Sequence, residues 1–143
     1  MVDRTLILRK LSALEEYLKQ IEEYRAISAD QYAKDWKTQR VIERTLQMMV
    51  EICIDIAGHI ISDKRYRVPI SYADSFSVLA ENKIVDNNLS QSLEKMAKFR
   101  NVVVHDYDRI DGEIVIGILR NNIDDFLGFK DAVVNFIRKE GAK

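Results

Sequence analysis

The chain has 143 residues, of which 47% are hydrophobic and 31% charged, and its formal net charge is -1 at pH 7. This near-neutral balance excludes a protein that coats nucleic acid through bulk positive charge. The single cysteine, Cys53, excludes an intrachain disulfide, and with only two histidines beside it no four-ligand zinc set is available. The length fits one domain over residues 1–143. Neither end has an apolar run of signal-peptide or membrane-span length, so we expect a cytoplasmic protein without membrane contact.

Apolar residues recur at helical spacing along the first half of the chain. Spacings of four and three predict an amphipathic helix over residues 3–26, with its apolar face formed by Ile7, Leu11, Leu14, Leu18 and Ile21. Residues 28–30 interrupt this pattern and are expected to cap a short turn of helix before Trp36. A longer helix is predicted over residues 37–62. Because its middle is apolar nearly all round, we expect this helix at the centre of the protein.

The long helix carries a polar ridge formed by Glu51, Asp55 and His59, which follow one another at intervals of four residues. We interpret the ridge as an intrahelical hydrogen-bond ladder or a contact between two copies of the chain, although a functional role stays open. A metal site at Asp55 and His59 is less favoured because further ligands are missing. Cys53 is interpreted as a small buried apolar residue, since nothing near it in the sequence would lower its pKa.

Three further helices are predicted, each after a clear turn, over residues 72–82, 89–104 and about 112–139. Pro69 marks the connection before the first of them, because proline pushes the preceding residue out of helical geometry. Asp111 is placed to cap the last one. Short connections between three long helices and two or three shorter ones predict an all-α fold, an antiparallel up-down bundle of five or six helices.

The densest group of chemically active side chains lies at the end of the helix over residues 89–104. Arg100, Asn101, His105 and Tyr107 fall within eight residues. Asn101 and His105 are one helical turn apart and therefore share a face. Arg100 and His105 are about 140° apart around the helix axis and cannot share a face of one straight helix. They can serve one site if the helix ends near His105, or if a second copy faces the first across a two-fold axis.

These residue types can cleave RNA without a metal. The histidine can take the proton of a ribose 2′-hydroxyl or give one to the leaving 5′-oxygen. The arginine fork can hold the phosphate and stabilise the charge that grows on it. Asn101 can orient the imidazole or bind a phosphate oxygen, and Tyr107 can anchor the substrate or stack on a base. A surface hydrogen bond explains the same Arg-x4-His spacing, so spacing alone does not decide the function.

Residues 99–107 resemble the motif of the HEPN superfamily, in which four to six residues separate an Arg from a His. More narrowly, the pattern Arg100-Asn101-x-x-x-His105-x-Tyr107 is similar to that of the HepT toxin family. The resemblance covers nearly the whole chain and is also carried by residues 51–61, 68–69, 75–76, 79–81 and 110–111.

The resemblance implies a HEPN bundle that forms a homodimer in which two motifs face one cleft, and a metal-independent endoribonuclease toxin that needs no cofactor. The implied partner is a minimal nucleotidyltransferase antitoxin of the MntA type, which adds AMP to the motif tyrosine. Arg100 and His105 would be catalytic, Asn101 supporting, and Tyr107 the modified residue. Glu51, Asp55 and His59 are further candidates for residues that support the site, beside the interpretations of the ridge given above. An AMP on Tyr107 would place an anionic phosphate and a bulky base where RNA must pass.

Two interpretations from other classes stay open. In one, the chain is a non-catalytic module that docks a nucleotidyltransferase and presents a nucleotide or substrate to it, because binding a phosphate needs the same residues as cleaving it. In the other, it is a purely structural dimerisation bundle, which leaves the cluster from Arg100 to Tyr107 unexplained. A small nucleotidyltransferase in the neighbouring reading frame would support the nuclease and the binding module, and its absence would support the structural bundle.

Overall fold

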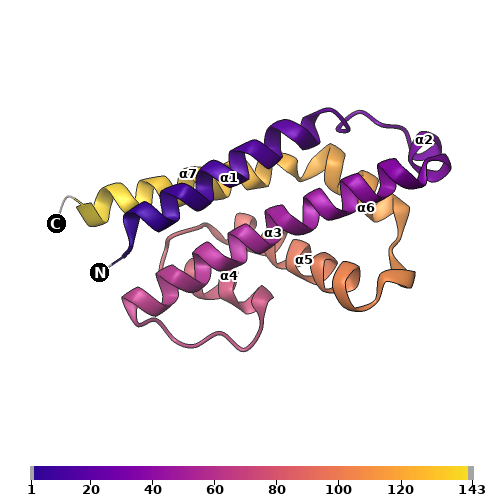
Figure 1. Ribbon diagram of the computed structural model, residues 1–143. Coiled ribbons are helices and arrows are strands. Elements are labelled where there is room, and N and C mark those ends of the chain that lie inside the picture. The colour runs from indigo at the N-terminus through magenta and orange to yellow at the C-terminus, as the bar shows by residue number, and fades with distance from the viewer. Residues whose placement is uncertain (1, 142–143) are drawn as a thin grey trace.

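The computed structural model describes residues 2–141, and all regular structure within this range is helical (Figure 1). This confirms the predicted all-α class. The elements are α1 (Arg4–Glu22), α2 (Ala29–Lys34), α3 (Trp36–Lys64), α4 (Tyr72–Glu81), α5 (Asn87–His105), a 3-10 turn η1 (Tyr107–Arg109), α6 (Gly112–Asn121) and α7 (Ile123–Gly141).

The bundle is built around α3, which contacts α1, α2, α4, α5 and α7. In Figure 1, α1 and α7 run side by side along one flank of α3, and α4 and α5 pack against another. By length and composition α3 could cross a membrane, but 56% of its most apolar window is buried inside the protein, as in the core helix of a soluble protein. Cys53 lies on this helix and is fully buried, as its interpretation as an apolar residue predicts. Burial raises the pKa of its thiol.

Side-chain caps fix the helix ends close to where the sequence predicts them. Ser28 and Gln31 form a reciprocal capping box at the start of α2. Asp86 and Asp111 cap α5 and α6 through backbone N–H groups of the first turn. The first helix ends at Glu22, earlier than predicted. Two backbone bonds that span only three residues close a tight turn there, from the N–H groups at positions 23 and 24 to the carbonyls at 20 and 21.

The last predicted helix is two helices, and this raises the number of α-helices in residues 2–141 to seven, one more than the upper limit of the prediction. The break is at Asn122, whose side-chain nitrogen donates to Asp125 Oδ2 at 3.0 Å. An asparagine that bonds locally in this way competes with the helical backbone pattern. Leu119 before the break and Ile123 after it are both buried, so the apolar period continues across the break and conceals it in the sequence.

The loop between α3 and α4 is held in place by a fork of ion pairs. Arg67 donates to both carboxylate oxygens of Asp74, at 2.7 and 2.9 Å, and to Glu81 at 2.8 to 3.2 Å. The Arg67 guanidinium lowers the pKa of the Asp74 carboxyl to about 2, and the backbone N–H of Ile70 contributes to the same shift. This loop and the start of α4 thereby keep a fixed position beside α3 and α5.

Candidate active site

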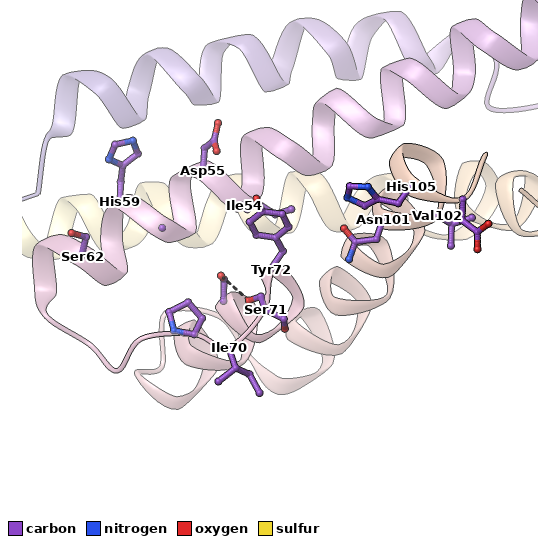
Figure 2. A pocket seen from close by; sticks show the side chains of 14 residues that line it. Ile54, Asp55, His59, Ser62, Ile70, Ser71, Tyr72, Asn101, Val102 and His105 are labelled. Carbon is purple, nitrogen blue, oxygen red and sulfur yellow. Dashed lines mark hydrogen bonds between the residues drawn. The ribbon is translucent and has the colours of Figure 1, made fainter. Parts of the chain in front are cut away.

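An open cleft of about 1070 Å³ lies between α3 and the C-terminal half of α5, next to the loop that precedes α4. Asn101 and His105 both line this cleft and lie next to each other in Figure 2, as their spacing of one helical turn predicts. The remaining polar residues of the lining are Asp55, His59, Ser62, Ser71, Tyr72, Ser75 and Asp106.

His105 is the last residue of α5 and is exposed to solvent. The helix ends here because Asp106 leaves helical geometry while its backbone N–H still bonds the Val102 carbonyl at 2.9 Å. Within residues 2–141 no side chain forms a hydrogen bond or an ion pair with the His105 imidazole. Both ring nitrogens are therefore available to a molecule in the cleft, which a general acid or base requires.

Arg100 is fixed by neighbours on its own helix, on α3 and on α4. Its Nε donates to Glu51 Oε1 at 3.0 Å, and Nη2 lies 3.0 Å from the same oxygen. Its Nη1 donates to Asn101 Oδ1 at 3.1 Å. The guanidinium also stacks on the Tyr72 ring, 5.2 Å from its centroid. These contacts use at most three of the five N–H groups of the side chain, so at least two remain for an anion.

Arg100 and His105 leave α5 on different sides, as their angular spacing predicts. Arg100 is only 15% exposed and is not part of the cleft lining, but it stacks on Tyr72, which is. Asn101 connects the two residues, because it bonds Arg100 and lines the cleft beside His105. Within one chain the motif is thus a His and an Asn that line the cleft, and a charged Arg that is bonded to the Asn without lining it.

The polar ridge of α3 divides between two environments. Glu51 accepts hydrogen bonds from Gln47 on its own helix, at 3.1 Å, and from Arg100 on α5. Asp55 pairs with Lys10 of α1 at 3.6 Å, and both Asp55 and His59 line the cleft. The three ridge residues do not bond one another, so the predicted ladder among them is wrong. Residues 2–141 contain no cluster of three or more His, Cys, Asp or Glu that can hold a metal ion.

Tyr107 lies in η1 and contributes to a different cavity, of about 720 Å³, which is also lined by Tyr32, Arg40 and Glu43. Its hydroxyl donates to Glu43 Oε1 at 2.6 Å, and Tyr32 donates to Glu43 Oε2 at 2.8 Å. The Arg40 guanidinium lies over the Tyr107 ring, 4.9 Å from its centroid. Tyr107 is 40% exposed, so its ring is accessible, but within one chain it does not line the cleft that holds His105.

The chemistry of this second cavity depends on Glu43, which is buried on α3. Burial raises the pKa of Tyr107, and the hydrogen bond to Glu43 raises it further. Burial and the same carboxylate also raise the pKa of Tyr32. Sequence reasoning missed Glu43 and Arg40. The available signal was that Glu43 directly follows Ile42 and precedes Leu46 by three residues, which puts a carboxylate on the buried face of the longest helix.

A family model described as ribonuclease HepT-like matches residues 14–133 of the chain. The chain belongs to the ribonuclease HepT-like family. It is 33% identical to a protein named mRNA nuclease HepT from Shewanella oneidensis, over 90% of this chain and 96% of that protein. It is 28% identical to a protein named tRNA nuclease HepT from Aphanizomenon flos-aquae, over 77% of this chain and 75% of that protein.

Several solved structures have the same fold as the chain. A tri-AMPylated HEPN toxin from Shewanella oneidensis, in complex with an MNT antitoxin, superposes with a TM-score of 0.84 at 32% identity, over 94% of this chain and 99% of that one. A toxin-antitoxin structure with AMP-PNP gives a TM-score of 0.85 at 31% identity, covering 92% and 99%. A cytosolic protein of unknown function from Bacillus subtilis, 20% identical with a TM-score of 0.83, shares the fold.

In this HepT-like chain the structure brings together Asn101, His105, Asp55 and His59 in one cleft, with Arg100 bonded to Asn101. It joins Glu51 to this group through Arg100. Tyr107 alone among the predicted site residues belongs to the second cavity. The site therefore has two parts, a cleft with an available imidazole and a tyrosine held by a carboxylate, separated by the end of α5.

Proposed function

We propose that the chain is a cytoplasmic endoribonuclease toxin that cleaves RNA at the His105 cleft and is silenced by a nucleotidyltransferase antitoxin. One observation carries the proposal: the unbonded His105 imidazole stands in an open cleft beside Asn101, to which the charged Arg100 is bonded. Family membership supports it, as do relatives named mRNA nuclease and tRNA nuclease and relatives described as toxins with antitoxins.

The proposed reaction is transesterification at phosphorus. His105 takes the proton of the 2′-hydroxyl, the 2′-oxygen bonds to phosphorus, and the bond to the 5′-oxygen breaks. An acid returns a proton to that 5′-oxygen, so the products are a 2′,3′-cyclic phosphate and a 5′-hydroxyl. The N–H groups of Arg100 that are not bonded to Glu51 or Asn101 stabilise the negative charge of the transition state.

This reaction needs both a base and an acid, whereas the motif supplies one imidazole, and the other histidine of the cleft, His59, lies well apart from His105 in Figure 2. We therefore infer a homodimer in which the motifs of two copies meet at a two-fold axis. One valine of α5 supports this inference. Val103 is buried within its own chain, and Val104 is 39% exposed and available to a second copy. Light scattering at micromolar concentration should give twice the monomer mass, and a monomer mass would contradict the inference.

The proposed cleavage is independent of divalent metal, because proton transfer and charge stabilisation suffice for attack by the 2′-hydroxyl. The test is cleavage of a defined single-stranded RNA with and without EDTA, followed by analysis of the product ends. Equal rates and 2′,3′-cyclic phosphate ends are expected. Activity that EDTA abolishes and that only a metal restores would refute the mechanism, and tight RNA binding without cleavage would favour the non-catalytic binding module.

We propose that silencing occurs by transfer of AMP from ATP to Tyr107. The partly exposed position of Tyr107 on η1 makes it reachable by a second protein. Support comes from the relative that is tri-AMPylated and bound to an MNT antitoxin. Intact-mass spectrometry after incubation with the cognate nucleotidyltransferase and ATP should show added AMP. An unchanged adduct on Tyr107→Phe would identify a different acceptor.

A further inference from the structure

The hydroxyl of Tyr107 is bonded to a carboxylate of its own chain. The Glu43 side chain is 6% exposed, and its Oε1 accepts from the Tyr107 hydroxyl at 2.6 Å. Its other oxygen accepts from Tyr32 on α2 at 2.8 Å, and this second bond fixes the plane of the carboxylate. One oxygen of Glu43 is therefore held facing the atom that would be modified, at the distance from which a general base acts.

We propose that Glu43 is the proton acceptor in the nucleotidylation of Tyr107, so that the toxin itself supplies a catalytic group for its own silencing. This inference rests on the proposed modification of Tyr107 by a nucleotidyltransferase. In the step, the Tyr107 oxygen bonds to the α-phosphorus of ATP and the bond from that phosphorus to the β-phosphate oxygen breaks. Pyrophosphate leaves, and the phenol proton passes to Glu43 and from there to solvent.

The surroundings of the hydroxyl suit a nucleotide. The cavity beside it has about 720 Å³, within the range of small-molecule sites. Arg40 lies 4.9 Å from the Tyr107 ring centroid, and its Nη1 is 3.5 Å from Glu43 Oε1, the oxygen that holds the hydroxyl. A half-exposed cation therefore stands where the α-phosphate would arrive and can offset the charge that grows on it.

A purely structural role does not account for the Tyr107 bond. The bond from Tyr32 already ties α2 to α3 through Glu43. Tyr107, in contrast, belongs to a 3-10 turn that contains no buried residue, so the core needs no additional tie there. The other charged groups that line the cavity are Arg40 from α3 and Asp111 and Glu113 at the start of α6. Of the three carboxylates that line the cavity, Glu43 is the one bonded to the Tyr107 hydroxyl.

The test compares the rate of AMP addition to the full-length wild type and to Glu43→Gln, using the cognate nucleotidyltransferase, ATP and intact-mass spectrometry. Glutamine keeps the shape and an acceptor oxygen but cannot take the proton, so the rate should fall by about a hundredfold or more. Between about pH 6.5 and 8.5 the wild-type rate should be nearly flat, while the variant rate should rise with pH as hydroxide replaces the lost base. Glu113→Gln is the matched control, because Glu113 lines the same cavity without bonding the Tyr107 hydroxyl, and it should change the rate by less than about fivefold.

Circular dichroism establishes that each variant is folded. If Glu43→Gln is not folded, Glu43→Asp serves instead, because it keeps the charge and withdraws the carboxylate from the hydroxyl by about one bond length; an intermediate loss of rate is then expected. Equal rates for wild type and a folded Glu43 variant would overturn this inference and leave the modification of Tyr107 intact. No adduct on the wild type would overturn the proposed modification and this inference with it.

Discussion

The ion pair between Arg100 and Glu51 offers a quantitative test of how the site is held. The side chains are 15% and 29% exposed, so the pair is neither a surface bridge nor a fully buried one. At an effective dielectric constant of about 20, charges about 4 Å apart attract by about 4 kcal/mol, and desolvation offsets part of this. We therefore expect Glu51→Gln to lower the free energy of unfolding by about 2 kcal/mol. For 143 residues this corresponds to a fall in Tm of roughly 7 °C.

The matched control is Asp55→Asn, one turn further along α3. Asp55 is 59% exposed and pairs with Lys10 at 3.6 Å, so its loss should cost less than about 0.5 kcal/mol. A double-mutant cycle of Glu51→Gln with Arg100→Gln, measured by denaturant unfolding, should give a coupling energy of about 1 to 3 kcal/mol. RNA cleavage by Glu51→Gln should fall at least about tenfold, because Arg100 loses the carboxylate that orients it. A coupling energy near zero, or a loss of stability equal to that of Asp55→Asn, would refute this reasoning.

Three further predictions address other contacts. Arg100→Lys keeps the charge but not the fork, so RNA cleavage should remain at least about tenfold below wild type; full activity would contradict the role of the fork. Tyr107→Phe removes a 2.6 Å hydrogen bond to the buried Glu43 carboxylate, and denaturant unfolding should show a loss of roughly 1.5 kcal/mol, whereas unchanged stability would contradict the bond. Arg67 lowers the pKa of Asp74 from 3.8 to about 2. The stability that this ion pair contributes is therefore fully present above pH 3.8 and is lost as the pH falls toward 2. The difference in Tm between wild type and Asp74→Asn should shrink over that range, and a difference independent of pH would exclude this linkage.

Local signals predicted most of the helices correctly. Capping residues and apolar spacing depend on neighbours within four residues, and such patterns are visible in the sequence, as at Ser28 and Asp111. The break at Asn122 was missed because Leu119 before it and Ile123 after it are both buried and four residues apart. Apolar periodicity indicates which face of a helix is buried. When one helix ends and the next begins with the same face buried, the periodicity is unbroken and does not reveal the boundary.

The site was only partly predictable, because its contacts join residues far apart in the chain. Helix geometry predicts that Asn101 and His105 share a face, and in the structure both line the cleft. Helix geometry does not predict the partner of Arg100, because Glu51 lies 49 residues away in the sequence. Tyr107 is two residues from His105, and sequence proximity suggested one shared environment. The end of α5 separates them, and the carboxylate that receives Tyr107, on Glu43, is 64 residues away.

The most direct test of the central claim is the rate of RNA cleavage by His105→Ala compared with His59→Ala, measured on the same single-stranded RNA. Both histidines of the chain line the same cleft. Comparing the two variants therefore shows whether cleavage depends on the motif histidine in particular or is lost when either imidazole is removed from the cleft. His105→Ala should lose about a hundredfold or more of the activity and should no longer arrest growth, with its helical circular dichroism unchanged. His59→Ala should lose less than about tenfold. Cleavage by His105→Ala at the wild-type rate would contradict the assignment of this cleft as the nuclease site.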